Sequence, residues 1–338
     1  MTLALVDEAQ RAGARLSRIC RELDLSARTV ERWRVRPDGD DRRLGPHHQP
    51  AHALSAAEEK RAVEMMTSGP YAGLSPKQLV PALADRGVYA ASESTLYRLR
   101  RRHGLGERRR TTERTHVSRG ARVHRATGPN QVWSWDITYL PTMVRGRYLY
   151  LYLVMDVWSR RIVGWTVAPH ESAELASELV QSICRDEGIE TKGLVLHSDN
   201  GGPMRGATMI ATLQWLGIVP SFSRPHVSDD NPYSEALFRT LKYAPSYPRQ
   251  PFISVDGASV WVTRFVGWYN EQHRHSSIRY VTPNQRHYGQ ETAVLARRHA
   301  LYQAARRRRP SRWSRATRDW TPVTMVELNP EPARRVAD

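Results

Sequence analysis

Three acidic residues stand in sequence patterns where a metal-binding carboxylate could serve catalysis. Asp136 lies in the middle of an alternating strand pattern, and the opposite face of that strand carries two tryptophans. An acid in such a strand is costly to bury unless a cation or another partner compensates its charge. Asp199 follows a short apolar run and precedes Asn200-Gly201-Gly202, a turn whose glycines allow a ligand to approach closely. Side-chain oxygens of this kind favour hard cations such as Mg²⁺ and Mn²⁺.

The third acid, Glu235, lies in the first turns of a predicted helix. Asn231 is the expected N-cap of that helix, and Pro232 fits its first position. At about 100° per residue, Arg239 and Lys242 fall on the same stripe as Glu235. A metal ligand followed by two phosphate-binding cations would suit a DNA substrate. Taken alone, however, the pattern favours an ordinary exposed helix face with an i,i+4 Glu–Arg pair.

The remaining polar residues near these acids fit structural roles better than catalytic ones. Asp156 lies among apolar residues, and we expect it to be a structural partner of Arg160 or Arg161 rather than a catalytic acid. His197 and His226 are expected to make local hydrogen bonds. Metal ligation by these histidines is disfavoured because hard cations prefer oxygen ligands.

The segments that must position the three acids alternate between strand and helix patterns, which predicts an α/β domain with a mixed sheet. An antiparallel meander of three strands is expected over residues 131–140, 146–157 and 161–167. Two short buried strands are expected later, over residues 193–197 and 218–223. Helices are predicted over residues 173–187, 207–216 and 255–273, in addition to the one that begins near Asn231.

The chain is strongly basic, with a formal net charge of +17 and a pI of about 10.4. This charge favours a polyanionic partner, and double-stranded DNA is the densest polyanion in a cell. No apolar run is long enough to span a membrane, and the first residues lack a secretory signal pattern. Cys20 and Cys184 are too far apart to suggest a zinc finger or a disulfide framework. We therefore expect a DNA-binding protein of the reducing cytoplasm with no membrane partner.

Composition divides the chain into a series of segments. Two helical units precede the α/β core, each followed by a linking stretch, and a basic helix and tail follow the core. The expected order is a first helix-turn-helix unit (1–36), a linker (37–53), a second helix-turn-helix unit (54–105), a basic connector (106–127), the core (128–290) and the C-terminal segment (291–338). Because no acid occurs between Ala293 and Thr317, the C-terminal arginines, among them Arg298, Arg306–Arg309, Arg312 and Arg318, are candidates for nonspecific phosphate contact.

Both helical units show apolar residues at helical spacing, followed by a capped second helix with a basic polar face. In the first unit, Ser26 can cap the second helix. In the second, Ser75-Pro76 begins one helix, and Ser92 or Ser94 begins the next. Small helical bundles also contain such pairs, but the basic faces favour helix-turn-helix units whose second helix enters a major groove. The candidate DNA-binding residues on these faces are Arg28, Thr29, Arg32, Ser94, Arg98, Arg101 and Arg102.

Several spaced motifs, in order, resemble the DDE transposases of bacterial insertion sequences, whose catalytic core is similar to that of retroviral integrases. The stretches are WSWDITYL, VMDVWSRRIVGW, LHSDNGG, SRPHVSDDNPYSEALFRTLKY and FVGWYNEQHRHSSIRYVTPNQRHYG. The resemblance covers about residues 125–290. Thirty-five residues separate Asp199 from Glu235, an interval that is typical of the family.

The resemblance implies an RNase H-like fold in which Asp136, Asp199 and Glu235 are the catalytic, metal-binding acids. It also implies two Mg²⁺ ions, for which Mn²⁺ can substitute, with Asp136 bridging them. Water would attack first and free a 3′-OH, which would then attack a target phosphodiester. The family's basic positions match Arg239 and Lys242. Asn200 and Asn231 would support the active-site loop.

The same resemblance implies transposon ends and target DNA as partners, a homodimer or larger assembly that holds two ends together, and an upstream reading-frame product as a further partner. Unlike retroviral integrases, this chain lacks an N-terminal His/Cys zinc module. Two alternatives stay open at this stage. One is an RNase H-like nuclease that cleaves without strand transfer, and the other is a non-catalytic DNA-binding regulator.

Overall fold

The computed structural model describes residues 2–35, 50, 52–105, 123–224 and 230–330. The chain forms two compact units, Met1–Ala53 and Leu54–Asp338. Among the described helices, none combines the length and the apolar character needed to cross a bilayer.

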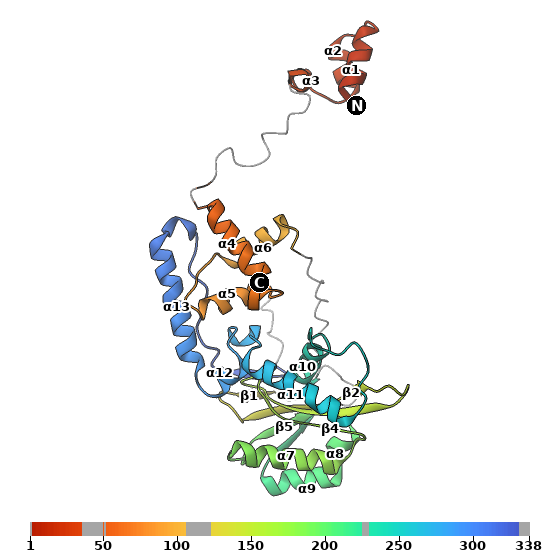
Figure 1. Cartoon of the computed structure of the whole chain (residues 1–338), viewed down its shortest axis with the longest axis vertical. Coiled ribbons are helices and arrows are strands. Elements are labelled where there is room, and N and C mark those ends of the chain that lie inside the picture. The colour runs from red at the N-terminus through yellow and green to blue at the C-terminus, as the bar shows by residue number, and fades with distance from the viewer. Residues whose placement is uncertain (1, 36–49, 51, 106–122, 225–229, 331–338) are drawn as a thin grey trace, which may run out of the picture. The chain divides into compact units, whose positions relative to one another are not determined.

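The second unit contains a five-stranded mixed sheet with the order β4-β3-β2-β5-β6 (Figure 1). Its first three strands form an antiparallel meander, whereas β5 runs parallel to β2, and β6 runs parallel to β5. This is the strand arrangement of an RNase H-like core, and it confirms the predicted α/β class. The strands are β2 (Val132–Pro141), β3 (Tyr148–Asp156), β4 (Ile162–Ala168), β5 (Val195–Ser198) and β6 (Val219–Phe222).

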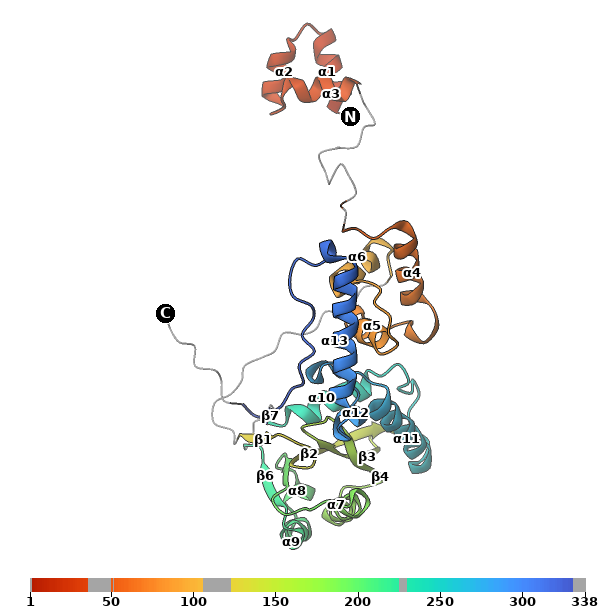
Figure 2. The same ribbon diagram turned by 90° about the vertical axis from the view of Figure 1, so that its left-hand side faces the viewer.

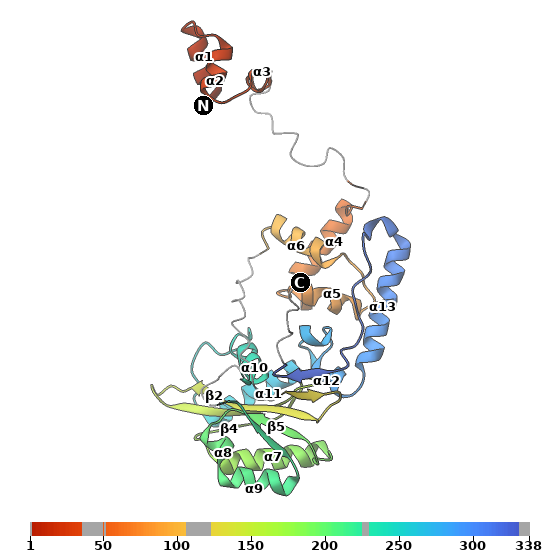
Figure 3. The same ribbon diagram turned by 180° about the vertical axis from the view of Figure 1, so that it is seen from behind.

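The alternation of side chains along β2 places apolar residues on both faces of the sheet, so helices cover each side (Figure 3). One layer consists of α7 (Ala173–Glu187), α8 (Gly202–Arg205) and α9 (Ala207–Leu216), which pack against Trp133 and Trp135. The other contains α10 (Pro232–Lys242) and α11 (Val255–Glu271), which pack against Leu140, Leu151 and Leu153. The expected helices are therefore present, and α11 ends two residues earlier than predicted.

A second, two-stranded sheet was not anticipated. β1 (His124–Ala126) pairs antiparallel with β7 (Val326–Leu328), and both strands pack on the start of β2 through Ala126, Val132 and Leu328 (Figure 2). The end of the expected connector and part of the expected tail thus belong to the folded core. Residues 106–122 of that connector lie outside the described residues.

The first unit contains three short helices, α1 (Thr2–Arg11), α2 (Leu16–Glu22) and α3 (Ala27–Val35). They enclose a small core of Val6, Ile19, Cys20 and Val30. The Ser26 hydroxyl accepts a 3.1 Å hydrogen bond from the Thr29 backbone N–H, as expected for a cap of α3.

The next helices are α4 (Ala56–Thr67), η1 (Gly69–Tyr71), α5 (Pro76–Ala84) and α6 (Glu93–Arg102). Ser75 forms a capping box with Gln78 at the start of α5. Ser92, rather than Ser94, caps α6 by accepting from the Thr95 N–H. These helices share one hydrophobic cluster with residues from the end of the chain, including Val294, Leu295, Tyr302 and Trp320.

The C-terminal segment is therefore more than a solvated basic helix. It contains α13 (Glu291–Arg308) and η4 (Pro310–Arg312), and it follows η3 (Ser276–Ile278) and α12 (Pro283–His287), which lie at the end of the expected core. The expectation that its arginines contact phosphate is wrong for Arg298, which is fully buried and pairs with Asp85 at 2.6 Å. Arg309 and Arg312 pair with Glu58, and Arg318 pairs with Glu93. These ion pairs attach α4 and α6 to the end of the chain.

Candidate active site

The fold brings the Asp136 carboxylate close enough to Asp199 and Glu235 for their negative charges to affect its pKa. Asp136 is partly buried in the central strand β2, where its Oδ1 accepts a 2.8 Å hydrogen bond from the Ile137 N–H. Burial raises the pKa of Asp136 to about 7, and the negative charges of Asp199, Glu235 and Glu171 add to this increase against the backbone hydrogen bond. Three carboxylates distant in sequence thus oppose the ionisation of Asp136.

Glu171 is a fourth acid that the sequence analysis missed. It lies in the turn between β4 and α7, and it also raises the pKa of Tyr139. Its position in a short polar turn carried no local signal of a site.

Asp199 follows β5 directly, as predicted, and a neighbouring strand fixes its orientation. The hydroxyl of Ser223, which follows β6, donates a 2.6 Å hydrogen bond to Asp199 Oδ1. The Asn200 side-chain amide donates to the Ser223 carbonyl oxygen at 2.5 Å. Because β5 and β6 are parallel neighbours, their carboxyl ends lie together and permit this contact. Ser223 was also missed, since only the sheet brings it to Asp199.

Glu235 is exposed in the first turn of α10, and the helix begins at Pro232 as predicted. The expectation that the Asn231 side chain caps this helix is wrong, because it makes no capping hydrogen bond. Instead, the Asn231 amide accepts from the Ser134 hydroxyl at 2.6 Å and donates to the Trp135 carbonyl oxygen at 3.1 Å. Ser134 also contacts the Ser234 hydroxyl at 2.6 Å.

We call Ser134, Asn231 and Ser234 the buried polar bridge, since all three are buried. It joins the strand that carries Asp136 to the helix that carries Glu235. The bridge therefore fixes the two acids relative to each other through groups adjacent to them in the chain.

Arg224 and Asp230, which lie before α10, form an ion pair. Arg224 binds Asp230 through both guanidinium and backbone N–H groups, at 2.8–2.9 Å. His197 contacts Ser221 at 2.9 Å and the Asp230 carbonyl oxygen at 3.0 Å, which confirms its predicted hydrogen-bonding role. His226 lies outside the described residues.

The face of α10 opposite its packed face carries two cationic side chains in addition to Glu235. Leu237 and Leu241 are buried, whereas Arg239 and Lys242 are exposed together with Glu235. The predicted charged stripe of Glu235, Arg239 and Lys242 is therefore confirmed, and the two buried leucines lie on the opposite face.

Asp156 is a structural residue, but its partners differ from those expected. It is fully buried, and it accepts hydrogen bonds from the Ser159 N–H and hydroxyl at 2.7 and 2.6 Å and from the Asn130 N–H at 2.8 Å. Within the described residues, no side-chain ion pair joins Asp156 to Arg160 or Arg161. The backbones of these two arginines instead form hydrogen bonds with the Asp156 backbone in the β3–β4 turn.

The donor set of Asp136, Asp199 and Glu235 fits a hard divalent cation. All three supply carboxylate oxygens, and a bound cation would offset both the burial of the Asp136 carboxylate and the charges of the neighbouring acids, which together raise its pKa. Within the described part of the chain, no three His, Cys, Asp or Glu side chains are already close enough together to form a complete metal site. Binding would therefore require the carboxylates to move towards a common centre.

The candidate DNA-binding residues of the helical units lie on exposed faces. Arg28, Arg32, Ser94, Arg98 and Arg101 are exposed, whereas Thr29 is partly buried. Arg102 is also exposed, and it forms a 3.1 Å ion pair with Glu59.

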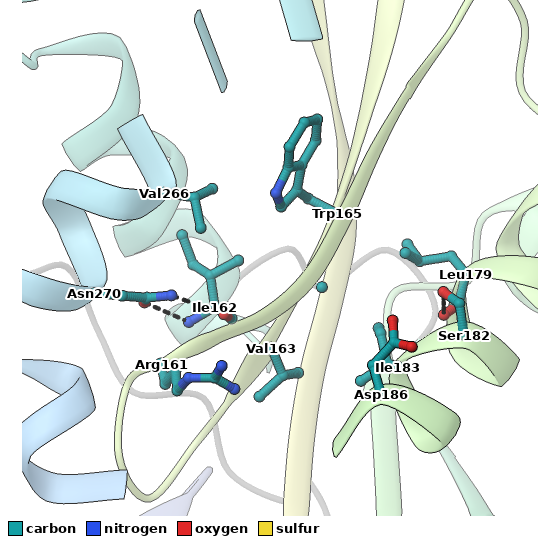
Figure 4. Close-up of a pocket in the computed structure, with 11 residues that line it drawn as sticks. Arg161, Ile162, Val163, Trp165, Leu179, Ser182, Ile183, Asp186, Val266 and Asn270 are labelled. Atoms are coloured by element: carbon teal, nitrogen blue, oxygen red, sulfur yellow. Dashed lines mark hydrogen bonds between the residues drawn. The ribbon is translucent and has the colours of Figure 1, made fainter. Parts of the chain in front are cut away.

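A pocket of about 410 Å³ lies elsewhere, at the edge strand β4 between α7 and α11 (Figure 4). There the Asn270 amide makes two 2.9 Å hydrogen bonds with the Ile162 backbone. None of the three predicted acids lines this pocket, so it is separate from the candidate active site.

Comparison with known protein families shows which domains this core resembles. Residues 126–228 and 216–283 match two family models, each described as an integrase core domain. Together the matches span the sheet and all three acids, so this segment is similar to known integrase core domains.

Two curated relatives, both transposases of insertion sequences, are similar to part of this chain. The chain is 31% identical to the transposase for insertion sequence element IS904 of Lactococcus lactis over 48% of this chain and 62% of the relative. It is 33% identical to transposase InsF for insertion sequence IS3A of Escherichia coli, over 47% of this chain and 54% of the relative. The chain is thus similar to insertion-sequence transposases, and the match spans 54–62% of the length of these two relatives.

Solved integrase cores are also similar. The catalytic core domain of BIV integrase is 18% identical over 48% of this chain and 97% of that chain, with a TM-score of 0.36. The HTLV-2 integrase catalytic core domain in complex with magnesium is 15% identical over 47% and 97%, with a TM-score of 0.34. Scores this low add no argument to the sheet topology described above.

Proposed function

We propose that this chain is a DNA transposase that cleaves DNA at transposon ends and joins the freed 3′-OH to target DNA. The observation that carries the proposal is that Asp136, Asp199 and Glu235 all lie in the segment that matches the integrase core models, on the central strand, after β5 and in the first turn of α10. An isolated structural acid in a central strand would be expected to have a cationic partner. The charges that add to the effect of burial on the pKa of Asp136 instead come from three acids, Asp199, Glu235 and Glu171.

Asp136, Asp199 and Glu235 would hold two Mg²⁺ ions, or Mn²⁺ in their place, with Asp136 shared between them. Such a pair of ions stabilises the attacking and leaving oxygens of an in-line phosphoryl displacement. The hydrogen bond from Ser223 orients Asp199, and the buried polar bridge orients the start of α10. Asn200 and Asn231 support the acids through these contacts.

Arg239 and Lys242 are proposed to bind the DNA backbone beyond Glu235, since both are exposed on the same helix face. The α2–α3 and α5–α6 pairs are proposed as helix-turn-helix units that recognise transposon ends, with Arg28, Arg32, Arg98 and Arg101 on exposed positions. We place this activity on bacterial DNA in the cytoplasm. The protein would act as a homodimer or larger assembly, and an upstream-frame product remains a proposed partner.

A strand-transfer assay tests the proposal. The full chain would be incubated with pre-cut candidate end DNA and a plasmid target, with Mg²⁺ and with EDTA. We expect Mg²⁺-dependent joining by the native protein and loss of joining by Asp199→Asn, with end binding retained. Cleavage without joining would favour the nuclease alternative. Binding without cleavage or joining would favour the regulator.

Light scattering of the complex with two ends bound tests the assembly. A mass that corresponds to two or more chains is expected, and a single chain holding both ends would contradict the proposal.

A further inference from the structure

The β2–β3 hairpin ends in a tip whose apolar side chains are exposed among the described residues. The two strands pair without interruption to Pro141 and Tyr148, and the hairpin projects from the sheet (Figures 1 and 3). Beyond this last pair, Met143 and Val144 are 64% and 56% exposed. Arg145 and Arg147 are exposed beside them.

The conformation of the tip is held by its own hydrogen bonds. The Thr142 hydroxyl donates to the Arg147 carbonyl oxygen at 2.9 Å and accepts from the Val144 N–H at 3.3 Å. The Arg147 N–H donates to the Val144 carbonyl oxygen at 3.0 Å. Gly146 supplies the positive φ of 83° that closes the turn. The apolar pair is therefore presented to solvent by a preformed turn.

A second exposed segment is attached to this tip. The Phe252 N–H donates to the Pro141 carbonyl oxygen at 2.9 Å, and Phe252 forms a bridge with Thr142. Ile253, which follows Phe252, is 89% exposed. Arg249, three residues before Phe252, is also exposed. This segment continues from the end of α10, so it connects the tip to the helix that carries Glu235.

The charge of the surface formed by the hairpin tip and the Phe252 segment indicates which kind of partner it would bind. No acid occurs between Ile137 and Met155 or between Ala236 and Val255, while both stretches contain arginine. A basic surface with a projecting apolar pair is complementary to a polyanion that has an apolar interior. Duplex DNA is such a polyanion, since its phosphates surround stacked bases. Proteins that kink DNA insert side chains such as methionine between base steps and bind the phosphates with cationic side chains.

We propose that the tip of the β2–β3 hairpin is a DNA wedge. Met143 and Val144 would enter between two base steps and bend the duplex, and Arg145 and Arg147 would bind the flanking phosphates. This inference rests on the proposed function for its partner, duplex DNA. It does not require catalysis, so it applies equally to a variant without cleavage activity.

Base unstacking tests the wedge directly. The full chain with Asp199→Asn, which blocks cleavage, would be mixed with duplexes that carry 2-aminopurine for unstacking and end-labelled dyes for bending. We expect increased 2-aminopurine fluorescence and increased energy transfer between the ends. Met143→Ser with Val144→Ser should abolish both signals while binding falls by no more than about tenfold. Trp215→Ser, which changes an apolar side chain that is 78% exposed on α9, is the matched control and should change neither signal.

A second variant separates the phosphate contacts from the wedge. Arg145→Ala with Arg147→Ala should weaken binding and reduce the slope of log affinity against log salt by about 1 per arginine. Unchanged bending by the serine variant, or no unstacking by the parent chain, would overturn the inference. A lower oligomeric mass of the serine variant with unchanged bending would identify the tip as a protein contact instead. Strand transfer by the native protein in that case would leave the proposed function intact, whereas absent DNA binding would remove both.

Discussion

The Ser134 hydroxyl in β2 donates a 2.6 Å hydrogen bond to the Asn231 side-chain oxygen at the start of α10. These residues are 97 positions apart, and both are fully buried. Asp136 lies two residues after Ser134, and Glu235 lies four residues after Asn231. The contact therefore joins the two chain segments that deliver the proposed metal-binding acids.

Replacing Asn231 with Ala should impair both stability and activity. The Trp135 carbonyl oxygen and the Ser134 hydroxyl would each lose the hydrogen bond to Asn231 in a buried environment, at a cost of about 1–3 kcal/mol, although Ser134 keeps its contact with Ser234. We expect a lower melting temperature and a higher Mg²⁺ concentration for half-maximal strand transfer, with end binding retained. Thr240→Ala, on the same helix, is the control. An unchanged Mg²⁺ dependence would show that the bridge does not position the acids.

Removal of the Asp136 charge should stabilise the metal-free protein at neutral and higher pH. The pKa of Asp136 in the folded protein is about 7, above its ordinary value of 3.8, so folding favours the protonated form. That contribution is complete below pH 4 and is lost as the pH rises through 7. In EDTA at pH 8, Asp136→Asn should therefore melt about 3 °C or more above the native protein.

Addition of Mg²⁺ provides the control for this comparison. It should raise the melting temperature of the native protein more than that of Asp136→Asn, because bound cations favour the carboxylate form. A variant that is less stable than the native protein in EDTA at pH 8 would contradict the assignment.

Acid should destabilise the protein through two histidines at the end of α11. Burial lowers the pKa of His273 to about 4, and burial, with the charges of Arg160 and His273, lowers that of His275 to about 3. Because the folded state favours the neutral rings, their contribution is present above pH 6.5 and decreases as the pH falls towards 4 and 3. His273→Phe, which keeps the stacking on Tyr269, should reduce the decrease in melting temperature between pH 7 and 4.5. An unchanged pH profile would exclude this contribution.

Arg298 and its neighbour provide a matched test of the C-terminal attachment. Arg298→Ala would leave Asp85 with Arg274 as its remaining cation. The Arg279 and Tyr280 carbonyl oxygens would lose the guanidinium donor in a buried environment, at a cost of about 1–3 kcal/mol. Arg297 is exposed one residue earlier, so Arg297→Ala should change the free energy of unfolding by less than about 0.5 kcal/mol. Denaturant unfolding of both variants measures the difference. Equal stabilities would mean that the buried ion pair does not hold α13 in place.

The sequence by itself determined the elements whose causes are local. Alternation in β2 predicted a strand with Asp136 opposite two tryptophans, and the Ser75 and Ser92 caps marked the starts of α5 and α6. Each of these depends on neighbours within a few residues, and periodicity and capping chemistry report on such neighbours. The three acids could be predicted as site residues because the chain contains, in order, the spaced sequence motifs of a known family.

Only the tertiary structure decided which distant groups meet. The Asn231 side chain turns from its expected cap to Ser134, Ser223 reaches Asp199, and Arg298 is buried on Asp85. The pairing of β1 with β7 joins segments that local patterns described as connector and tail. A short polar residue or an arginine has the same sequence signature whether it faces solvent or a buried partner. The partner is set by which segments the sheet and its helices bring together, and no local pattern contains that information.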